Sequence, residues 1–420
     1  MTKRAIIAGA GLTGLSAAFH LKKSGIEPVT FEQNSYPGGL SASFIKNGFI
    51  FDFTGHYLHF KSAYAKDLAF GLLGGKFNEV KRRASVRAGG ELIDYPFQEN
   101  FGQLKDSSIV SACEKGLKDR KPSENYGSFR EWILGEYGKG IAENFMLPYN
   151  EKLWQYDLDA MLYLGTTAYT PSSKNDAKKN GYNASFYYPS EGGASEVAKA
   201  LAPLAGEIRC KSRICSINPS ARSVTVNDNI VFEYGRLIST MPLPELIAMI
   251  PSAPAAVKQA ASSLQYTSVF ALNLGIKRAG ISDKHWIYFP DKSLPFYRVG
   301  FYSNVARHLA PEGTTSLYAE VAYPGGSVID REAETAKIKE GLIRAGILEP
   351  KDVILAELPM EIPFAYVVYD LEYKKNTSLI FDFLCSKGIV STGRYGGWAY
   401  SAMEDALLDG KNAAEDILDA

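Results

Sequence analysis

A glycine-rich turn near the start of the chain constrains its fold more than any other segment. Gly9, Gly11 and Gly14 form a GxGxxG element, with Leu12 and Thr13 between the last two glycines. The first glycine permits a tight turn, the second lets the backbone approach a pyrophosphate, and the third lets a helix pack on a strand. The turn follows an apolar run typical of a buried strand and opens a run at helical spacing. This context predicts a dinucleotide site at a helix N-terminus, where free N–H groups favour phosphate.

The residues after the turn strengthen this interpretation. We expect a strand over 4–8, a helix over 12–24 and a second strand over 27–32 that ends in Glu32. Glu32 lies about 20 residues after the turn, where a carboxylate can bind a ribose hydroxyl. A strand, helix and strand in this order predict a parallel sheet. A glycine-rich turn without a ligand is the alternative.

Length and charge bound the remaining possibilities. A chain of 420 residues is too long for one compact core, so two or three domains are expected. Lys plus Arg equals Asp plus Glu at 46 each, which argues against a nucleic-acid partner and a polybasic membrane anchor. No apolar run approaches the roughly 18 residues of a membrane span. An acidic substrate would need local arginines.

The cysteines and histidines give no metal pattern. The four cysteines form no CxxC pair and the five histidines do not cluster, so no structural metal site is expected. Sparse cysteines fit a reducing cytosol, which predicts a cytoplasmic protein. Cys210 and Cys215 could pair, but two separate buried thiols are the favoured interpretation.

The rest of the chain divides by its patterns. Residues 126–146 are helix-like, 170–182 form a polar segment expected to be a mobile loop, and 264–322 hold alternating apolar runs typical of antiparallel strands. A last short strand is expected over 388–393, with a final helix from near Ser401.

The segment after Glu32 distinguishes FAD from NAD. Gly38, Gly39, Leu40 and Ser41 resemble the extended fingerprint of the amine-oxidase-like FAD proteins, in which adjacent glycines let the chain pass close to the flavin. Gly393, with the helix after it, resembles the same superfamily. That helix, expected from near Ser401, would point its positive end at the flavin and stabilise the anion of reduced flavin. Met403 and Glu404 stand where the superfamily members resembled here have polar residues near the flavin.

Several longer motifs are similar to the UDP-galactopyranose mutase family, especially its eukaryotic-type branch. The segments that carry the resemblance are FDFTGHYLHF (51–60), DYPFQENF (94–101), FREWILGEYGKGIAENFMLPYNEKLW (129–154), NASFYYPSEGG (183–193), RLISTMP (236–242), HWIYFPDKSLPFYRVGFYSN (285–304) and GRYGGWAY (393–400). The YPFQ, PYNxxxW and PFYR elements are specific to that family among flavoproteins.

The resemblance implies a mixed α/β fold: a Rossmann-like FAD-binding domain, an inserted helical domain and an antiparallel β-sheet substrate domain of about six strands. The expected boundaries are 1–80, 184–265 and 355–420 for the FAD domain, 101–183 for the helical domain, and 81–100 with 266–354 for the sheet domain. It also implies interconversion of the pyranose and furanose forms of a UDP-sugar, with N5 of reduced FAD as nucleophile at the anomeric carbon. NAD(P)H reduces the flavin in some members, and a role in cell-wall or polysaccharide biosynthesis and a homo-oligomeric state are further expectations.

The site residues follow by resemblance. The expected catalytic group is His56, Arg298 and Arg394, with His56 near flavin N5. The substrate-binding group adds Arg82, Tyr95, Phe97, Gln98, Asn150, Trp154, Asn183, Trp286, Tyr288, Tyr366 and Tyr400.

The residue chemistry supports part of this set. Aromatic rings and amides that both donate and accept suit a nucleotide base, although Phe97 and Trp154 could equally be core aromatics. Arg298 is a single charge on an otherwise apolar strand, so it must be paired or face a ligand such as a diphosphate. For Arg298 the alternatives are an internal salt bridge or an exposed face of the strand. For the tyrosines and Trp286 the alternative is ordinary packing in the core. For His56 the alternative is a structural histidine.

One departure from the family pattern concerns the diphosphate. The family has a second arginine after a Leu-Gly pair, but here Leu164 and Gly165 precede Thr166 and Thr167. Loss of one charged contact weakens binding by roughly 1.5–3 kcal/mol unless it is replaced, and Lys174 or Lys178 could replace it without the fork geometry. Two other functions therefore stay open: an FAD-dependent oxidoreductase of the amine-oxidase superfamily, and a non-catalytic flavoprotein that binds a nucleotide sugar or a partner.

Overall fold

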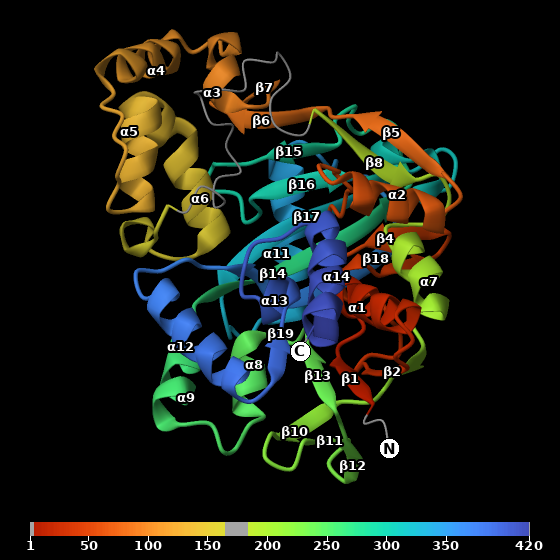
Figure 1. Ribbon diagram of the computed structural model, residues 1–420. Helices are drawn as coiled ribbons and strands as arrows, with labels where there is room; N and C mark the ends of the chain where they lie inside the picture. Colours follow the sequence, from red (N-terminus) through yellow and green to blue (C-terminus); the bar gives the residue numbers. More distant parts are fainter. Residues whose placement is uncertain (1–3, 164–183, 420) are drawn as a thin grey trace.

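The computed structural model describes residues 4–163 and 184–419 (Figure 1). Asn183, Lys174, Lys178, the four residues 164–167 and the expected loop over 170–182 lie outside these ranges. Within the described residues the chain builds one parallel sheet, one larger mixed sheet and a group of helices at one end.

The parallel sheet carries the glycine turn. Its three central strands are fully or largely buried, as expected of a parallel sheet covered on both faces, whereas its two edge strands are partly exposed. Its order is β19 (Ile389–Ser391), β13 (Arg236–Ser239), β1 (Ala5–Ala8), β2 (Pro28–Phe31) and β9 (Glu207–Arg209). The expected strands near both ends of the chain and the parallel pairing of β1 with β2 are thereby confirmed.

Two helices from opposite ends of the chain pack together beside this sheet. α1 (Leu12–Lys23) and α14 (Met403–Asp419) lie side by side in Figure 1, and the Ser16 hydroxyl donates to the Leu407 carbonyl at 2.6 Å. Gly410 allows the close approach, because a Cβ there would lie 2.3 Å from the Thr13 carbonyl oxygen. The C-terminal helix therefore returns to the N-terminal glycine turn.

The larger sheet has seven strands rather than about six. Its order is β18 (Ile354–Val367), β14 (Tyr266–Ile276), β17 (Thr315–Pro324), β16 (Arg298–Phe301), β15 (Trp286–Tyr288), β6 (Ala84–Ala88) and β7 (Glu91–Asp94). Neighbours pair in antiparallel fashion except β15 and β6, which are parallel. The antiparallel strands expected over 264–322 are confirmed as β14 to β17.

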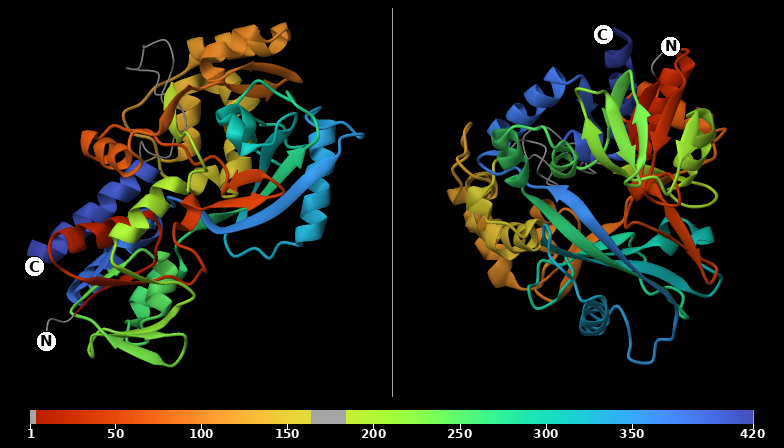
Figure 2. Two further views of the ribbon diagram at one scale, coloured as in Figure 1. Left: turned by 90° about the vertical axis from the view of Figure 1, so that its right-hand side faces the viewer. Right: turned by 90° about the horizontal axis from the view of Figure 1, so that it is seen from below.

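The two faces of this sheet bury different partners. Val299 and Phe301 point to one face and pack with α11 (Arg331–Arg344), whereas Arg298 and Gly300 point to the other, as strand alternation requires. Figure 2 shows α11 on the side of the sheet away from the parallel sheet. The face that carries Arg298 is thus turned toward the rest of the molecule.

The helical region contains α4 (Ser107–Asp119), α5 (Phe129–Ile141), a π-helical turn (Ala142–Met146) and α6 (Leu147–Trp154). The helix expected over 126–146 begins three residues later, where the Ser128 side chain caps it by accepting from Glu131 N–H at 3.2 Å. Gly138, at φ +71°, interrupts α5. A Cβ at Gly138 would lie 2.0 Å from the Gly116 carbonyl oxygen, so α4 and α5 touch backbone to backbone.

Smaller elements complete the described chain. The short strands are β3 (Ser43–Lys46), β4 (Phe49–Asp52), β5 (Phe77–Lys81), β8 (Ser185–Pro189), β10 (Ile214–Asn218), β11 (Ser223–Val226) and β12 (Ile230–Glu233). The remaining α-helices are α2 (Ala63–Leu72), α3 (Phe97–Asn100), α7 (Glu196–Leu201), α8 (Leu243–Ala248), α9 (Ala255–Ser262), α10 (Tyr302–Val305), α12 (Tyr373–Ser386) and α13 (Gly393–Gly396).

Across residues 4–163 and 184–419, no helix combines the length and apolarity that crossing a bilayer requires. All four cysteines are free, which confirms separate thiols, but Cys210 and Cys215 are partly exposed rather than buried. In the same ranges no group of His, Cys, Asp and Glu is arranged to hold a metal ion.

Candidate cofactor and nucleotide site

The glycine turn between β1 and α1 leaves room beside only one of its glycines. A Cβ on Gly9, at φ +100°, would meet the Thr240 hydroxyl at 2.4 Å, and one on Gly14 would meet the Gly9 carbonyl oxygen at 1.9 Å. A Cβ on Gly11 would meet nothing within 4 Å. Gly9 and Gly14 are therefore needed by the fold itself, whereas Gly11 borders open space where a cofactor backbone would pass.

The N-terminal end of α1 is built for an anion. Gly11 is its N-cap, with extended backbone and no capping side chain, so the first-turn N–H groups stay available to phosphate. Glu32 is buried at the end of β2, and its carboxylate accepts from Ala10 N–H at 2.9 Å and Asn34 N–H at 2.8 Å. This places a fixed carboxylate next to the turn, as a ribose-binding residue requires.

The second glycine pair packs on the first. Gly38 N–H donates to the Ala10 carbonyl at 2.8 Å, and a Cβ on Gly39 would lie 3.1 Å from the Gly11 Cα. Ser41 closes this turn, since its hydroxyl donates to the Gly38 carbonyl at 2.7 Å, while Leu40 is partly buried against the core. The 38–41 segment therefore lies directly over the phosphate-binding turn.

The C-terminal segment reaches the same turn. Gly393, at φ +80°, packs on Thr13, because a Cβ there would lie 2.7 Å from the Thr13 hydroxyl. Two predicted cofactor residues have other side-chain contacts: Met403 is buried in the core beside α1, and the Glu404 carboxylate accepts from Lys61 N–H at 2.8 Å. Only their backbone atoms at the start of α14 are left to meet a cofactor.

A row of three polar side chains crosses the face of the larger sheet that is turned toward the rest of the molecule. Tyr288, Arg298 and Glu320 are direct register partners on β15, β16 and β17. Arg298 Nη2 donates to Glu320 Oε1 at 2.9 Å and Nε donates to the other carboxylate oxygen, with the side chains 13% and 2% exposed. Burial alone would lower the pKa of Arg298, but the charge of Glu320 keeps that pKa well above its ordinary value.

The ion pair is the internal salt bridge that the sequence left open as the alternative for Arg298. It uses Nε and Nη2 and leaves both N–H groups of Nη1 outside the pair. Glu320 is a candidate site residue that the sequence interpretation missed. It is one carboxylate in the apolar run SLYAEVAY, the same signal that identified Arg298.

Aromatic residues surround this row. Tyr95 and Tyr288 lie with ring centroids 5.0 Å apart, and the Arg82 guanidinium lies 4.9 Å from the Tyr95 ring. Phe97 is fully buried and stacks on Phe145 at 5.2 Å, which favours core packing for this ring. Arg82, Tyr95 and Tyr288 thus come together, whereas Phe97 packs on Phe145 in the core.

The Gln98 amide lacks the partners that a buried amide needs. Its Oε1 and Nε2 are both buried, and neither has a hydrogen-bond partner in the described structure. An unsatisfied buried polar atom costs about 1–3 kcal/mol. A base edge that both donates and accepts would satisfy this amide.

Asn150 and Trp154 satisfy each other one turn apart on α6. Trp154 Nε1 donates to Asn150 Oδ1 at 3.1 Å, and Asn150 Nδ2 donates to the Met146 carbonyl at 2.7 Å. Trp154 is 1% exposed, with its ring centroid 6.0 Å from that of Tyr366. Asn150 still has one donor hydrogen and acceptor capacity for a ligand.

Arg394 lies next to two of the predicted tyrosines, Tyr366 and Tyr400. Its guanidinium lies 4.7 Å from the Tyr400 ring and 5.5 Å from the Tyr366 ring, and donates to the Ser401 and Ala365 carbonyls at 2.6 and 2.7 Å. In the described part of the chain it forms no ion pair. Arg394 therefore adds a positive charge that no carboxylate offsets.

His56 lies within the influence of both arginines. Burial, followed by the charges of Arg394 and Arg298, lowers its pKa from 6.5 to about 4. Its Nδ1 is buried without a hydrogen-bond partner in the described structure. His56 is therefore neutral at physiological pH, with one ring nitrogen available to a ligand.

Tyrosines that the sequence interpretation missed pack beside His56. Trp286 stacks on Tyr57 at 5.4 Å, and the Tyr318 ring fills the space over Gly300, where a Cβ would lie 2.1 Å from it. Tyr57 could have been found from its position next to His56, but nothing in the sequence brings Tyr318 to this loop.

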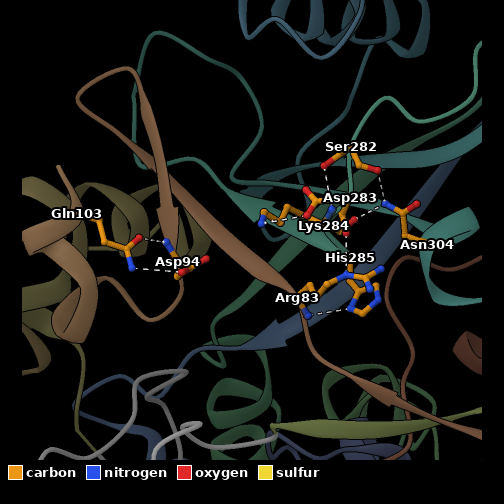
Figure 3. Close-up of polar contacts among 8 residues, drawn as sticks. All are labelled: Arg83, Asp94, Gln103, Ser282, Asp283, Lys284, His285 and Asn304. Atoms are coloured by element: carbon orange, nitrogen blue, oxygen red, sulfur yellow. Dashed lines mark hydrogen bonds and ion pairs between the residues drawn. The ribbon is translucent and has the colours of Figure 1, made fainter. Parts of the chain in front are cut away.

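Figure 3 shows how the segment just before Trp286, the first residue of β15, is held. His285 Nδ1 accepts from Arg83 N–H at 3.0 Å, while His285 N–H donates to the Arg83 carbonyl at 2.7 Å. Burial lowers the pKa of His285 to about 4, so the ring stays neutral and can accept. On the neighbouring hairpin, Gln103 bonds Asp94 through its side-chain oxygen and nitrogen at 2.9 and 3.2 Å, which anchors the segment that leads to Gln98.

Comparison with known proteins decides the family. The family model described as flavin containing amine oxidoreductase matches residues 12–418. The chain belongs to the flavin-containing amine oxidoreductase family. This family is flavin-dependent, and the glycine turn with Glu32 fits the phosphates and ribose of FAD.

Individual relatives of this amine oxidoreductase differ in activity. A solved structure of reduced UDP-galactopyranose mutase is similar with TM-score 0.91 and 26% identity, covering 100% of this chain and 96% of that chain. Cyclohexylamine oxidase from Brevibacterium oxydans IH-35A has TM-score 0.70 and 14% identity, covering 100% and 99%, which shows the shared fold. Coproporphyrinogen III oxidase of Staphylococcus aureus (strain NCTC 8325 / PS 47) is 21% identical over 473 residues, 100% of this chain and 99% of the relative.

Proposed function

We propose that this flavoprotein is a nucleotide-sugar mutase that interconverts the pyranose and furanose forms of a UDP-sugar. The observation that carries the proposal is the row of Tyr288, Arg298 and Glu320 on the face of the larger sheet that is turned toward the rest of the molecule. The similarity to UDP-galactopyranose mutase over the whole chain supports it, because the match includes the sheet that carries this row.

The charges suit a diphosphate. Glu320 offsets the charge of Arg298, so Arg298 contributes a directed donor, Nη1, while Arg394 contributes the net positive charge. Tyr288, Tyr366 and Tyr400 supply hydroxyl groups around them. Arg82, on the far side of Tyr95, adds a further guanidinium toward the same face.

The unsatisfied amide of Gln98 supports a base subsite. With Tyr95 and Asn150 it offers an aromatic face, donors and acceptors suited to uracil. When bound and reduced, FAD supplies the nucleophile for the anomeric carbon. His56 then offers its unpaired ring nitrogen at the flavin edge, and Trp286 with Tyr57 borders the sugar. NAD(P)H is the external reductant in this proposal.

A second function also has support. The Staphylococcus aureus relative that matches over its full length is named as an oxidase, which favours an FAD-dependent oxidoreductase that acts on another small molecule. The Arg298–Glu320 pair would then be structural, and a nucleotide would not bind beside it.

The test compares two redox states of the same protein. Dithionite-reduced and air-oxidised samples are mixed with UDP-galactofuranose or related UDP-sugars, and the products are separated by chromatography. We expect the pyranose isomer only from the reduced sample, and none from an Arg298→Ala variant that retains FAD. Absence of exchange with every UDP-sugar in reduced, FAD-loaded protein would overturn the proposal.

A further inference from the structure

Lys152, on α6, is a partly buried cation that donates only to backbone carbonyls in the described structure. Its Nζ donates to three carbonyls of the segment that joins β15 to β16: Phe289 at 2.8 Å, Asp291 at 2.8 Å and Phe296 at 2.6 Å. An ammonium has three donor hydrogens, so these contacts use all of them. One nitrogen atom, Nζ of Lys152, thus donates hydrogen bonds to carbonyls near both ends of the 289–297 connection.

This arrangement is costly, which indicates a specific use. Burial lowers the pKa of Lys152 to about 7, and the described residues place no carboxylate within ion-pair distance of it. A partly buried charge held only by carbonyl dipoles loses hydration that an apolar side chain of similar length, such as methionine, does not lose. Methionine, however, could not hold three carbonyl groups. The benefit of the lysine therefore lies in the shape of the connection.

The connection leads directly into the proposed diphosphate residues. Tyr288 precedes it and Arg298 follows it. Within it, Phe289 N–H donates to the Tyr297 carbonyl at 2.9 Å, and Phe289 packs its ring on Phe296 toward α11. The carbonyls of the connection that accept from Lys152 therefore point toward α6, while the Phe289 and Phe296 side chains pack on the sheet face covered by α11.

Helix α6 carries the proposed base residues on either side of Lys152. Asn150 lies two residues before it and Trp154 two residues after. The Tyr149 ring packs on Tyr288 at 5.4 Å, and the Trp154 carbonyl accepts from the Thr267 hydroxyl at 2.9 Å. Lys152 joins the middle of this helix to both ends of the β15–β16 connection.

We infer that Lys152 is a positioning residue that sets the spacing between the base-facing residues of α6 and the diphosphate-facing pair Tyr288 and Arg298. The inference rests on the proposed function. If it holds, the affinity of a ligand that contacts both the base-facing residues and the diphosphate-facing pair depends on Lys152. The affinity of a fragment that contacts only one of these two groups does not.

The experiment uses FAD-loaded full-length protein and three probes: UDP, uridine and inorganic pyrophosphate. Affinities are measured by calorimetry or, for weak ligands, by ligand-observed NMR. We expect Lys152→Met to weaken UDP binding at least tenfold and each fragment less than threefold. Lys152→Arg, which keeps several donors, should recover UDP affinity to within about threefold of the unchanged protein.

A matched control removes another contact between the same segments. Lys292 forms an exposed ion pair with Glu151 at 2.6 Å, and exposed pairs contribute little. Lys292→Met should leave UDP affinity within twofold. If Lys152→Met does not fold, Lys152→Gln, which keeps two donor hydrogens, is compared in its place.

Two results would overturn the inference while the proposed function stands: UDP affinity unchanged in a folded, FAD-loaded Lys152→Met protein, or uridine affinity reduced as much as UDP affinity. Failure of the unchanged, FAD-loaded protein to bind UDP would overturn the proposed function itself, and the inference with it.

Discussion

Arg298 and Glu320 face each other in register on β16 and β17 and form a buried ion pair on the sheet face that is turned toward the FAD-binding region. The pair fixes the guanidinium in one orientation, with Nε and Nη2 on the carboxylate and Nη1 left over. A buried charge pair contributes little net stability, because desolvation offsets the attraction. In the proposed function its value is geometric, since it holds the guanidinium in one orientation for the diphosphate.

Removing Arg298 alone should therefore be costly to folding. Arg298→Ala leaves Glu320 buried without its partner, so we expect a loss of about 3–5 kcal/mol in the free energy of unfolding. The double variant Arg298→Met with Glu320→Leu should regain most of that loss, since an apolar pair needs no charge partner. Urea unfolding measures both. FAD content should stay unchanged, and loss of FAD from either folded variant would mean that Arg298 belongs to the cofactor site.

The glycines of the turn should separate folding from cofactor binding. At Gly11 a Cβ meets no protein atom, so Gly11→Ala should leave the stability of the FAD-free protein within about 0.5 kcal/mol and reduce FAD occupancy. At Gly14 a Cβ would lie 1.9 Å from the Gly9 carbonyl oxygen, so Gly14→Ala should destabilise the protein itself. Flavin absorbance per chain and thermal unfolding distinguish them. Full FAD occupancy in Gly11→Ala would place the pyrophosphate elsewhere.

Replacing Gln98 should raise the stability of the ligand-free protein and lower its affinity for UDP. Gln98→Leu removes two unsatisfied buried polar atoms, so the ligand-free protein should gain about 1–3 kcal/mol in unfolding free energy. UDP affinity should fall at least tenfold, because the amide is the proposed partner of the base. Gln103→Leu is the control: its amide already bonds Asp94, so it should lose stability slightly and keep UDP affinity. Lower stability of Gln98→Leu would show that the amide is satisfied in solution.

Asp52 should make the free energy of unfolding fall as pH rises, whereas a salt-bridged carboxylate makes it rise with pH. Burial raises its pKa from 3.8 to about 6, although Ser43, Tyr188 and the Ala194 N–H donate to it. The folded protein thus binds this proton more tightly than the unfolded chain. Stability is highest below pH 4 with respect to this group and falls as pH rises to about 6, by roughly 3 kcal/mol.

The Asp52→Asn variant isolates this effect, because it cannot titrate. The unfolding free energy of the unchanged protein minus that of the variant should fall between pH 4 and 6 and stay flat from pH 7 to 8. A difference that rises with pH would mean that the hydrogen bonds outweigh the burial of Asp52.

The sequence was informative where local chemistry decides structure. The glycine turn and Glu32 form one local unit, so their geometry could be predicted from spacing. Arg298 was identified because a single charge on an apolar strand needs a partner. The identity of that partner, Glu320, depends on strand pairing across 22 residues, which periodicity does not reveal.

Other elements were missed for identifiable reasons. β18 spans 14 residues but contains Pro359 and Pro363, and prolines argue against a strand in the sequence. The two prolines are tolerated because β18 lies at the edge of its sheet. The break at Gly138 is set by the approach of Gly116 from another helix. Lys152 resembles any lysine of a surface helix, and only the fold brings three carbonyls to it.

The most direct test counts product against reductant. FAD-loaded protein is reduced once with a limiting amount of dithionite, given excess UDP-galactofuranose without oxygen, and the pyranose isomer formed is divided by the reducing equivalents consumed. An isomerisation that returns its flavin unchanged predicts many product molecules per equivalent. One product per equivalent, or continuous consumption of NADPH or oxygen with substrate, would contradict the mutase function and favour an oxidoreductase.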